Sequence, residues 1–328
     1  MREPVALVGS ARGVRVSGLL PDGRLAEPLG GDEALVGVLP PVYPEWLGDR
    51  SFVAAHGCRF PYVVGEMARG IATAEMVVAA ARAGLMAFFG SAGLPIPVID
   101  EAIARIREAL GPGVPNWGAN LIHSPQEPHL EMEFAELMLA RGVRNVSASA
   151  FMRLSPAVVW LAAKGLEQGP RGEVRRRTHI FAKVSRVEVA RPFLSPAPDG
   201  MLRALVEEGR ITPEEAALAR RVPVAEDLTV EADSGGHTDN RPLPVLLPRM
   251  IALAREVSEE HGYALPPRVG VGGGLGTPAA VASAFAAGAA YVVTGSVNQC
   301  TVESGLSEDG RLLLAGASMT DVAMAPAA

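Results

Sequence analysis

Two glycine-rich turns stand one repeat apart in the last third of the chain. In the first, at 268–278, an apolar run ends in three glycines and leads directly into a helix start at Thr277-Pro278. In the second, the next apolar run ends in Thr-Gly-Ser at 294–296. Glycines let backbone N–H groups approach a phosphate closely, and the dipole of a helix start favours its negative charge. We expect a phosphate group to be bound by Gly272, Gly273, Gly274, Thr294, Gly295 and Ser296.

A dense polar stretch follows another apolar run, at 231–241. Its paired glycines would let the loop pass close to a flat ligand, with His237 projecting over it. A histidine can act as an acid near neutral pH or donate a hydrogen bond. Asp239 and Arg241 could instead pair with each other to brace the loop. The candidate ligand-contacting residues here are Glu231, Gly235, Gly236 and His237, with His237 as a candidate catalytic residue.

Further polar side chains stand where other apolar runs end, and Glu66, Asn120 and Lys183 occupy such positions. Asparagine and lysine suit the edge of a flavin ring, which needs hydrogen-bond donors and tolerates a cation near N1. We therefore expect these three residues to contact a flavin, with Lys183 as a second candidate catalytic residue. His123, just before a Ser-Pro pair, could simply cap the next helix.

A repeated unit of sequence predicts how these residues are brought together. From about residue 50, short apolar runs alternate with alanine-rich helical stretches. Continuous apolar strands between helices indicate a parallel sheet covered on both faces. Eight such units in about 250 residues favour a closed α/β fold, the parallel (β/α)8 TIM barrel, with its site at the carboxyl ends of the strands. The expected strands are 62–66, 85–89, 116–121, 145–148, 179–184, 228–232, 268–271 and 291–294.

Two stretches interrupt the repeat and suggest how the chain is organised. Residues 1–49, with strand-like runs at 5–8 and 13–17, are expected to form a small N-terminal subdomain or to cover the floor of the barrel, which takes 50–328. Residues 186–226, between strands five and six, are too long for a simple connection. Because they contain a helix capping box and follow a barrel strand, we expect a helical lid over the site.

Composition and missing motifs exclude several classes of protein. The net charge of −6 gives no general attraction to nucleic acid or anionic lipid. No apolar run has the length of a membrane span, and no signal peptide or metal-binding cysteine pattern is present, so we expect a cytoplasmic protein without a metal. A Rossmann fold is rejected, because the acidic residue that it needs after the next strand is replaced by the turn at 294–296.

Longer motifs carry a resemblance to a known family. They lie at 120–128, 231–242 and 294–299, with 193–198 and 321–326 in addition. In these stretches the chain resembles the PfaD-type trans-acting enoyl reductases of polyunsaturated fatty acid and polyketide synthases. These enzymes are relatives of nitronate monooxygenases and of the flavin-dependent enoyl-ACP reductases. The resemblance covers nearly the whole chain.

The resemblance implies cofactors, a substrate and a partner. FMN would be held in the barrel with NADPH as reductant, and hydride would pass from flavin N5 to the β-carbon of an enoyl-phosphopantetheine thioester on an acyl carrier protein. The turns at 272–274 and 294–296 would hold the FMN phosphate, and Asn120 and Lys183 would contact the ring. His237 would bind nucleotide, polarise the thioester carbonyl or supply the α-proton. The chain could form a homodimer.

Two departures from related patterns bear on the alternatives. Nitronate monooxygenases are expected to place a histidine base after strand four, where this chain has Ser147 and Ser149. Family members are expected to continue past 321–326, and the part beyond would serve carrier-protein docking or dimerisation. The leading interpretation is a trans-acting, FMN-dependent enoyl-ACP reductase. A flavin oxidase of the nitronate monooxygenase kind and a non-catalytic flavin-binding subunit are the alternatives.

Overall fold

The chain divides into two compact units, Met1–Leu47 and Gly48–Ala328. The computed structural model describes residues 3–234, 239–321 and 323. The main sheet of the first unit is antiparallel, and that of the second unit is parallel.

The N-terminal unit is a three-stranded antiparallel sheet. Its strands β1 (Val5–Ser10), β2 (Gly13–Gly18) and β3 (Ala34–Leu39) pair in the order β2-β1-β3, and the short 3-10 helix η1 (Pro44–Trp46) follows. β1 and β2 coincide with the two strand-like runs of the sequence, whereas β3 is an additional strand. Arg15 of β2 forms ion pairs with Glu27 at 2.9 Å and Glu33 at 2.8 Å, which tie the long β2–β3 connection to the sheet.

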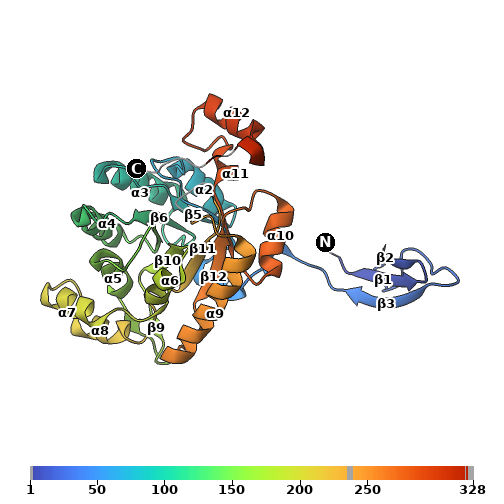
Figure 1. Ribbon diagram of the computed structural model, residues 1–328, viewed down its shortest axis with the longest axis horizontal. Helices are drawn as coiled ribbons and strands as arrows, with labels where there is room; N and C mark the ends of the chain where they lie inside the picture. Colours follow the sequence, from blue (N-terminus) through green and yellow to red (C-terminus); the bar gives the residue numbers. More distant parts are fainter. Residues whose placement is uncertain (1–2, 235–238, 322, 324–328) are drawn as a thin grey trace. The chain divides into compact units, whose positions relative to one another are not determined.

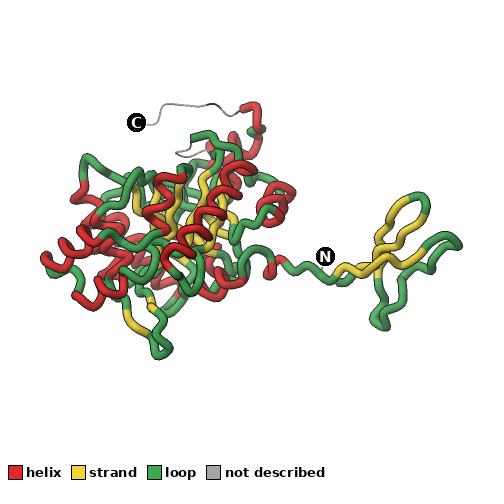
Figure 2. Tube along the Cα trace, turned by 60° about the horizontal axis from the view of Figure 1, so that its bottom comes forward, coloured by secondary structure: helices red, strands yellow, loops and turns green. Residues whose placement is uncertain are grey.

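The larger unit is a closed barrel of eight parallel strands surrounded by helices, which confirms the predicted fold (Figures 1 and 2). The strands follow the order β4-β5-β6-β7-β10-β11-β12-β13, and β13 pairs with β4 to close the barrel. Each barrel strand overlaps one of the eight expected strands. They are β4 (Tyr62–Val64), β5 (Met86–Phe89), β6 (Trp117–Ile122), β7 (Asn145–Ser149), β10 (His179–Val184), β11 (Asp227–Glu231), β12 (Arg268–Gly272) and β13 (Val292–Thr294), with the hairpin β8 (Glu167–Gln168) and β9 (Val174–Arg175) before β10.

Local sequence signals start several of the surrounding helices. The hydroxyls of Thr73 and Thr277 accept the N–H groups of Met76 and Ala280 and so cap α2 and α10. No helix in the described part of the chain is long and apolar enough to cross a membrane. Outside 186–226 the helices are α1 (Arg50–His56), α2 (Ala74–Arg82), α3 (Ile96–Leu110), α4 (Pro128–Arg141), α5 (Pro156–Ala163), α9 (Leu243–His261), α10 (Pro278–Ala286), α11 (Ser296–Gln299), α12 (Glu308–Gly316) and the 3-10 helix η2 (Met319–Asp321).

The insertion between β10 and β11 folds into three helices, α6 (Val187–Leu194), α7 (Asp199–Glu207) and α8 (Pro213–Ala219). Thr212 and Glu215 form the expected capping box at the start of α8. α6 packs on α9 and β10, while α7 and α8 pack on α5. No residue of the insertion lines the cavity described below. A lid role for 186–226 stays a prediction, and this packing does not favour it.

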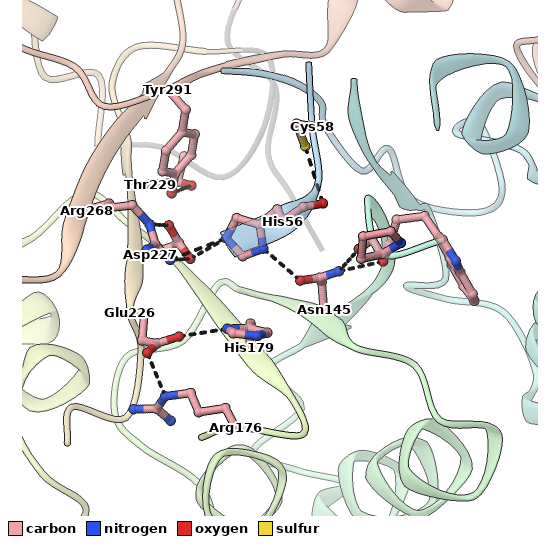
Figure 3. Close-up of polar contacts among 12 residues, drawn as sticks. His56, Cys58, Asn145, Arg176, His179, Glu226, Asp227, Thr229, Arg268 and Tyr291 are labelled. Atoms are coloured by element: carbon pink, nitrogen blue, oxygen red, sulfur yellow. Dashed lines mark hydrogen bonds and ion pairs between the residues drawn. The ribbon is translucent and has the colours of Figure 1, made fainter. Parts of the chain in front are cut away.

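A polar network closes the amino-terminal end of the barrel (Figure 3). His56, at the end of α1, lies between two strand-initial residues, with Nδ1 3.1 Å from Asn145 Oδ1 and Nε2 2.9 Å from Asp227 Oδ2. Arg268 donates two hydrogen bonds to Asp227, at 2.6 and 2.7 Å. Burial raises the pKa of Asp227, but Arg268 and His56 outweigh this effect and hold that pKa below its ordinary value. The network joins α1 to β7, β11 and β12.

A neighbouring carboxylate makes the fold sensitive to acid. Glu226, just before β11, contacts Arg176 at 3.1 Å and His179 at 2.7 Å (Figure 3). Burial raises the pKa of Glu226, but these two partners outweigh it and lower the pKa from 4.5 to about 2. A carboxylate with a lowered folded-state pKa stabilises the fold above its unfolded-state pKa, and this contribution is lost as the pH falls toward the folded-state value.

We therefore expect the free energy of unfolding to decrease as the pH falls from 4.5 to about 2, in part through Glu226. The Glu226→Gln variant has no such carboxylate, so it should lose less stability over this window. Urea unfolding followed by circular dichroism at a series of pH values measures the difference. Equal losses in the two proteins would contradict this role of Glu226.

Candidate functional site

One cavity lies at the carboxyl ends of the barrel strands. Its volume of about 550 Å³ is within the range of about 300–1,000 Å³ of small-molecule sites. Ten of the sequence-predicted site residues line this cavity, and the other three, Gly235, Gly236 and His237, lie outside the described residues. The ten are Glu66, Asn120, Lys183, Glu231, Gly272, Gly273, Gly274, Thr294, Gly295 and Ser296.

Bare backbone forms one part of the cavity wall. Gly273 has a φ of +99°, and a Cβ there would lie 2.7 Å from the carbonyl oxygen of Asp233, so the turn after β12 requires glycine at this position. At Gly274, Gly276 and Gly295, by contrast, no heavy atom of the described residues, apart from those next to each glycine in the chain, lies within 4 Å of where a Cβ would stand. These three glycines, named the open cradle below, leave room for a ligand to approach the main chain.

The turn after β13 provides fewer free hydroxyls than its sequence suggests. The hydroxyl of Thr294 donates to the hydroxyl of Tyr62 at 2.7 Å, and Asn298 donates to the carbonyl oxygen of Thr294 at 2.8 Å. The side chain of Thr294 is therefore engaged within the protein. Ser296, which is exposed, and the backbone of the turn are the groups that it presents to the cavity.

Three charged side chains meet across the interior of the barrel. Lys183 on β10 and Glu66 after β4 come from strands on opposite sides of the barrel, and Lys183 Nζ lies 3.1 Å from Glu66 Oε1. The same Nζ lies 3.3 Å from Oε1 of Glu231, at the end of β11. We name Glu66, Lys183 and Glu231 the charged floor of the cavity. It contains two carboxylates for one ammonium group.

Neutral side chains hold Glu66 in place. Its Oε1 accepts hydrogen bonds from the hydroxyls of Ser147 at 3.0 Å and Ser149 at 2.7 Å. Asn120 in turn donates from Nδ2 to the carbonyl oxygen of Ser147 and to the hydroxyl of Ser149, at 3.1 and 3.0 Å. Ser147 and Ser149, which the structure places within β7, thus hold Glu66 of the charged floor.

Electrostatics keep Lys183 and Glu66 ionised. Burial lowers the pKa of Lys183, but Glu66 and Glu231 outweigh it and raise the pKa above its ordinary value. Burial raises the pKa of Glu66, but Lys183 and Ser149 outweigh it, so that this pKa is lowered. A lysine with a raised pKa is a poor proton donor near neutral pH. Lys183 is therefore suited to act as a fixed cation and hydrogen-bond donor.

The loop after β11 is anchored differently from the pairing considered in the sequence. Asp239 accepts two hydrogen bonds from Arg186, both at 2.7 Å, and one from the hydroxyl of Ser185 at 2.8 Å. Arg186 and Ser185 lower the pKa of Asp239 to about 2. The bracing partner of Asp239 is thus Arg186 and not Arg241. This contact fixes the loop to the end of β10, immediately after the stretch that contains His237.

Two other residues at strand ends have structural partners. His123 does not cap α4: its Nδ1 lies 2.9 Å from Oε1 of the buried Glu131, and its ring stacks on Phe151. Ser91, which is not among the residues predicted from the sequence, accepts the N–H of Asn120 at 3.1 Å and donates to its carbonyl oxygen. Ser91 follows the end of β5, so the rule that selected Asn120 and Lys183 would also have selected Ser91.

Comparisons with known proteins agree with this fold and site. No family model matches the chain. It is 49% identical over 284 residues to one component of the polyunsaturated fatty acid synthase of Thraustochytrium sp., a match that covers 86% of the chain and 19% of that relative. It is 43% identical to the polyketide biosynthesis protein PksE of Bacillus subtilis, over 86% of the chain and 37% of PksE.

A solved structure extends this likeness to three dimensions. The enoyl reductase domain of MlnA, from the macrolactin biosynthesis cluster of Bacillus amyloliquefaciens, matches with a TM-score of 0.83 and 38% identity, over 86% of the chain and 64% of that domain's chain. The chain spans less than two thirds of the length of each of these relatives. Since the barrel, the site motifs and the relatives agree, the chain belongs to the family of PfaD-type enoyl reductases of polyunsaturated fatty acid and polyketide synthases.

Proposed function

We propose that the chain is an FMN-dependent, NADPH-using, trans-acting enoyl-ACP reductase. The observation that carries the proposal is one cavity that combines the open cradle with the charged floor, on a barrel that is 38% identical to an enoyl reductase domain. A bound FMN supplies hydride transfer between NADPH and the β-carbon of an enoyl thioester. The thioester would be carried by the phosphopantetheine arm of an acyl carrier protein of a fatty acid or polyketide synthase. A homodimer is a further prediction.

The described residues fit the two ends of FMN. The open cradle leaves backbone accessible to a phosphate, as glycine-rich turns do in other phosphate sites. Asn120 donates both of its amide hydrogens to the protein, so it offers its carbonyl oxygen to the N3–H of the ring. Lys183 directs two of its three N–H groups at Glu66 and Glu231. One N–H group remains for the N1 and O2 edge of the ring.

We propose His237 as the group that supplies the α-proton after hydride transfer. His237 lies outside the described residues, and it is proposed from its place in the sequence, directly after paired glycines and between Glu231 and Asp239. If His237 donates the proton, His237→Ala should lower turnover by about 10²-fold or more while FMN stays bound. His261→Ala, which removes an exposed histidine at the end of α9, is the matched control. Unchanged turnover of a crotonyl thioester by His237→Ala would exclude His237 as the proton donor.

The experiment that tests the proposed function is anaerobic stopped-flow absorbance at the flavin band. NADPH is mixed with the FMN-loaded protein, and a crotonyl thioester of an acyl carrier protein is added second. Bleaching by NADPH followed by reoxidation by the thioester is the expected result. Reoxidation by oxygen or a nitronate alone would indicate the flavin oxidase of the nitronate monooxygenase kind. The absence of bleaching would indicate a non-catalytic flavin-binding subunit.

A further inference from the structure

We propose that Ser149 is a positioning residue, which orients the side-chain amide of Asn120 so that the cavity selects a ligand with an N–H donor at that place. The inference rests on the proposed flavin cofactor, whose ring has such a donor at N3. It goes beyond the contact proposed for Asn120, because it identifies the side chain that sets the direction of this contact and the kind of ligand that the direction disfavours.

The position of Asn120 is fixed by its main chain. The hydroxyl of Ser91 accepts the N–H of Asn120 at 3.1 Å and donates to its carbonyl oxygen. Asn120 lies within β6, lines the cavity and is 3% exposed. The direction of its terminal amide then decides whether the cavity meets an N–H donor or a carbonyl acceptor.

One hydrogen-bond partner of this amide has a fixed role. The carbonyl oxygen of Ser147 lies 3.1 Å from Asn120 Nδ2. A carbonyl oxygen can only accept a hydrogen bond, so the nitrogen of the amide, and not its oxygen, belongs on this side. Ser147 therefore holds one of the two N–H groups of Asn120 away from the cavity.

The second partner, the hydroxyl of Ser149, can either donate or accept, so its direction depends on a further group. That group is Glu66, whose Oε1 lies 2.7 Å from the hydroxyl and whose lowered pKa keeps it ionised. An ionised carboxylate can only accept, so the hydrogen of Ser149 points toward Glu66. The oxygen of Ser149 is then left to accept the second N–H of Asn120, at 3.0 Å.

This arrangement leaves the carbonyl oxygen of Asn120 for a ligand. Within the part of the chain that the structure describes, no hydrogen bond reaches Oδ1 of this nearly buried side chain. A buried acceptor without a partner is unfavourable, so a ligand that places an N–H group here is favoured over one that does not. An amide turned the other way would place its oxygen against the carbonyl oxygen of Ser147. The site therefore favours a donor at this place on the ligand.

The test compares FMN with N3-methyl FMN, in which a methyl group replaces the hydrogen at N3. The flavin-free full chain is titrated with each, and flavin fluorescence gives the two dissociation constants. The parent protein should bind FMN at least about tenfold more tightly than N3-methyl FMN, because the analogue leaves the buried acceptor unpaired. Ser149→Ala removes the group that orients Asn120, so it should weaken FMN binding by about fivefold to tenfold and leave the binding of N3-methyl FMN within about twofold of the parent value.

Ser147→Ala is the matched control, because both serines lie in β7, are buried and donate to Glu66 Oε1. Asn120 uses only the carbonyl oxygen of Ser147, which this exchange retains. The preference of Ser147→Ala for FMN should therefore stay within about twofold of the parent value. If Ser149→Ala weakens both flavins equally, or if the two variants lose the preference equally, Ser149 is only structural and the inference is wrong. If Ser149→Ala does not fold, Ser149→Cys decides by the same criterion, because a thiol is a weak acceptor.

A second measurement decides if N3-methyl FMN binds too weakly for titration. Exchange of the N3 hydrogen of bound, isotope-labelled FMN with water, followed by NMR, should be at least about fivefold faster in Ser149→Ala than in the parent protein and in Ser147→Ala. Equal exchange rates in all three proteins would overturn the inference. A parent protein that binds both flavins equally would also overturn it, while the proposed cofactor would stand. Failure of the parent protein to bind FMN would instead remove the proposed cofactor.

Discussion

The Gly276→Asp variant is expected to lose at least about a hundredfold in FMN affinity while the barrel keeps its fold, because a carboxylate would enter the space proposed for the phosphate. Gly276 lines the cavity, and within the part of the chain that the structure describes no heavy atom beyond the adjoining residues lies within 4 Å of the position of a Cβ there. It is also not among the glycines with a positive φ, so a side chain does not strain the backbone in the left-handed region. Titration of the flavin-free protein with FMN, followed by flavin fluorescence, measures the loss.

Gly200→Asp provides the matched control for this exchange. Gly200 lies in α7, outside the cavity, and it shares with Gly276 both the open space at its Cβ position and the absence of a positive φ. Its variant should bind FMN as the parent protein does, and the thermal midpoints of both flavin-free variants should stay close to the parent value. If Gly276→Asp retains full FMN affinity, the phosphate does not bind at the open cradle.

The barrel could be predicted because its strands carry their signal locally. Most contain a short apolar run bounded by turn residues, and β5 and β11, for example, are buried along their whole length. β3 gives a weaker signal, because it belongs to a small sheet and most of its side chains are exposed. The capping box marks where α8 begins, but it does not say which surface the helix covers. The packing of α7 and α8 on α5 depends on tertiary contacts that no local pattern contains.

The candidate site could be predicted as a set of positions but not as a set of contacts. Parallel strands bring their carboxyl ends together, so residues selected at strand ends were expected to meet. Whether Lys183 reaches Glu66 depends on the diameter of the closed barrel, which no local sequence pattern gives. Asp239 shows the same limit, because its nearest arginine in sequence is Arg241, whereas the structure pairs it with Arg186.

Asp227→Ala is expected to cause a large loss of stability, because Asp227 belongs to the polar network at the amino-terminal end of the barrel. Asp227 is fully buried and bonded to both Arg268 and His56. Removing one partner of a buried ion pair leaves the other charge uncompensated, which typically costs about 3–5 kcal/mol. The variant would leave the Arg268 guanidinium, whose side chain is 11% exposed, without its carboxylate. Urea unfolding of the parent and variant at neutral pH measures the difference in the free energy of unfolding.

The chain contains a second arginine–aspartate pair with nearly the same geometry and a different environment. Arg141 donates two hydrogen bonds to Asp100, both at 2.6 Å, but the two side chains are 44% and 32% exposed. Water screens this pair and solvates whichever partner remains after a substitution, so Asp100→Ala should change the stability little. Both aspartates accept two hydrogen bonds from one arginine, but Asp227 is buried and also contacts His56. The comparison therefore measures what burial and the His56 contact add to the loss of an ion-pair partner. Equal losses in the free energy of unfolding for Asp100→Ala and Asp227→Ala would mean that the network around His56 does not stabilise the amino-terminal end of the barrel.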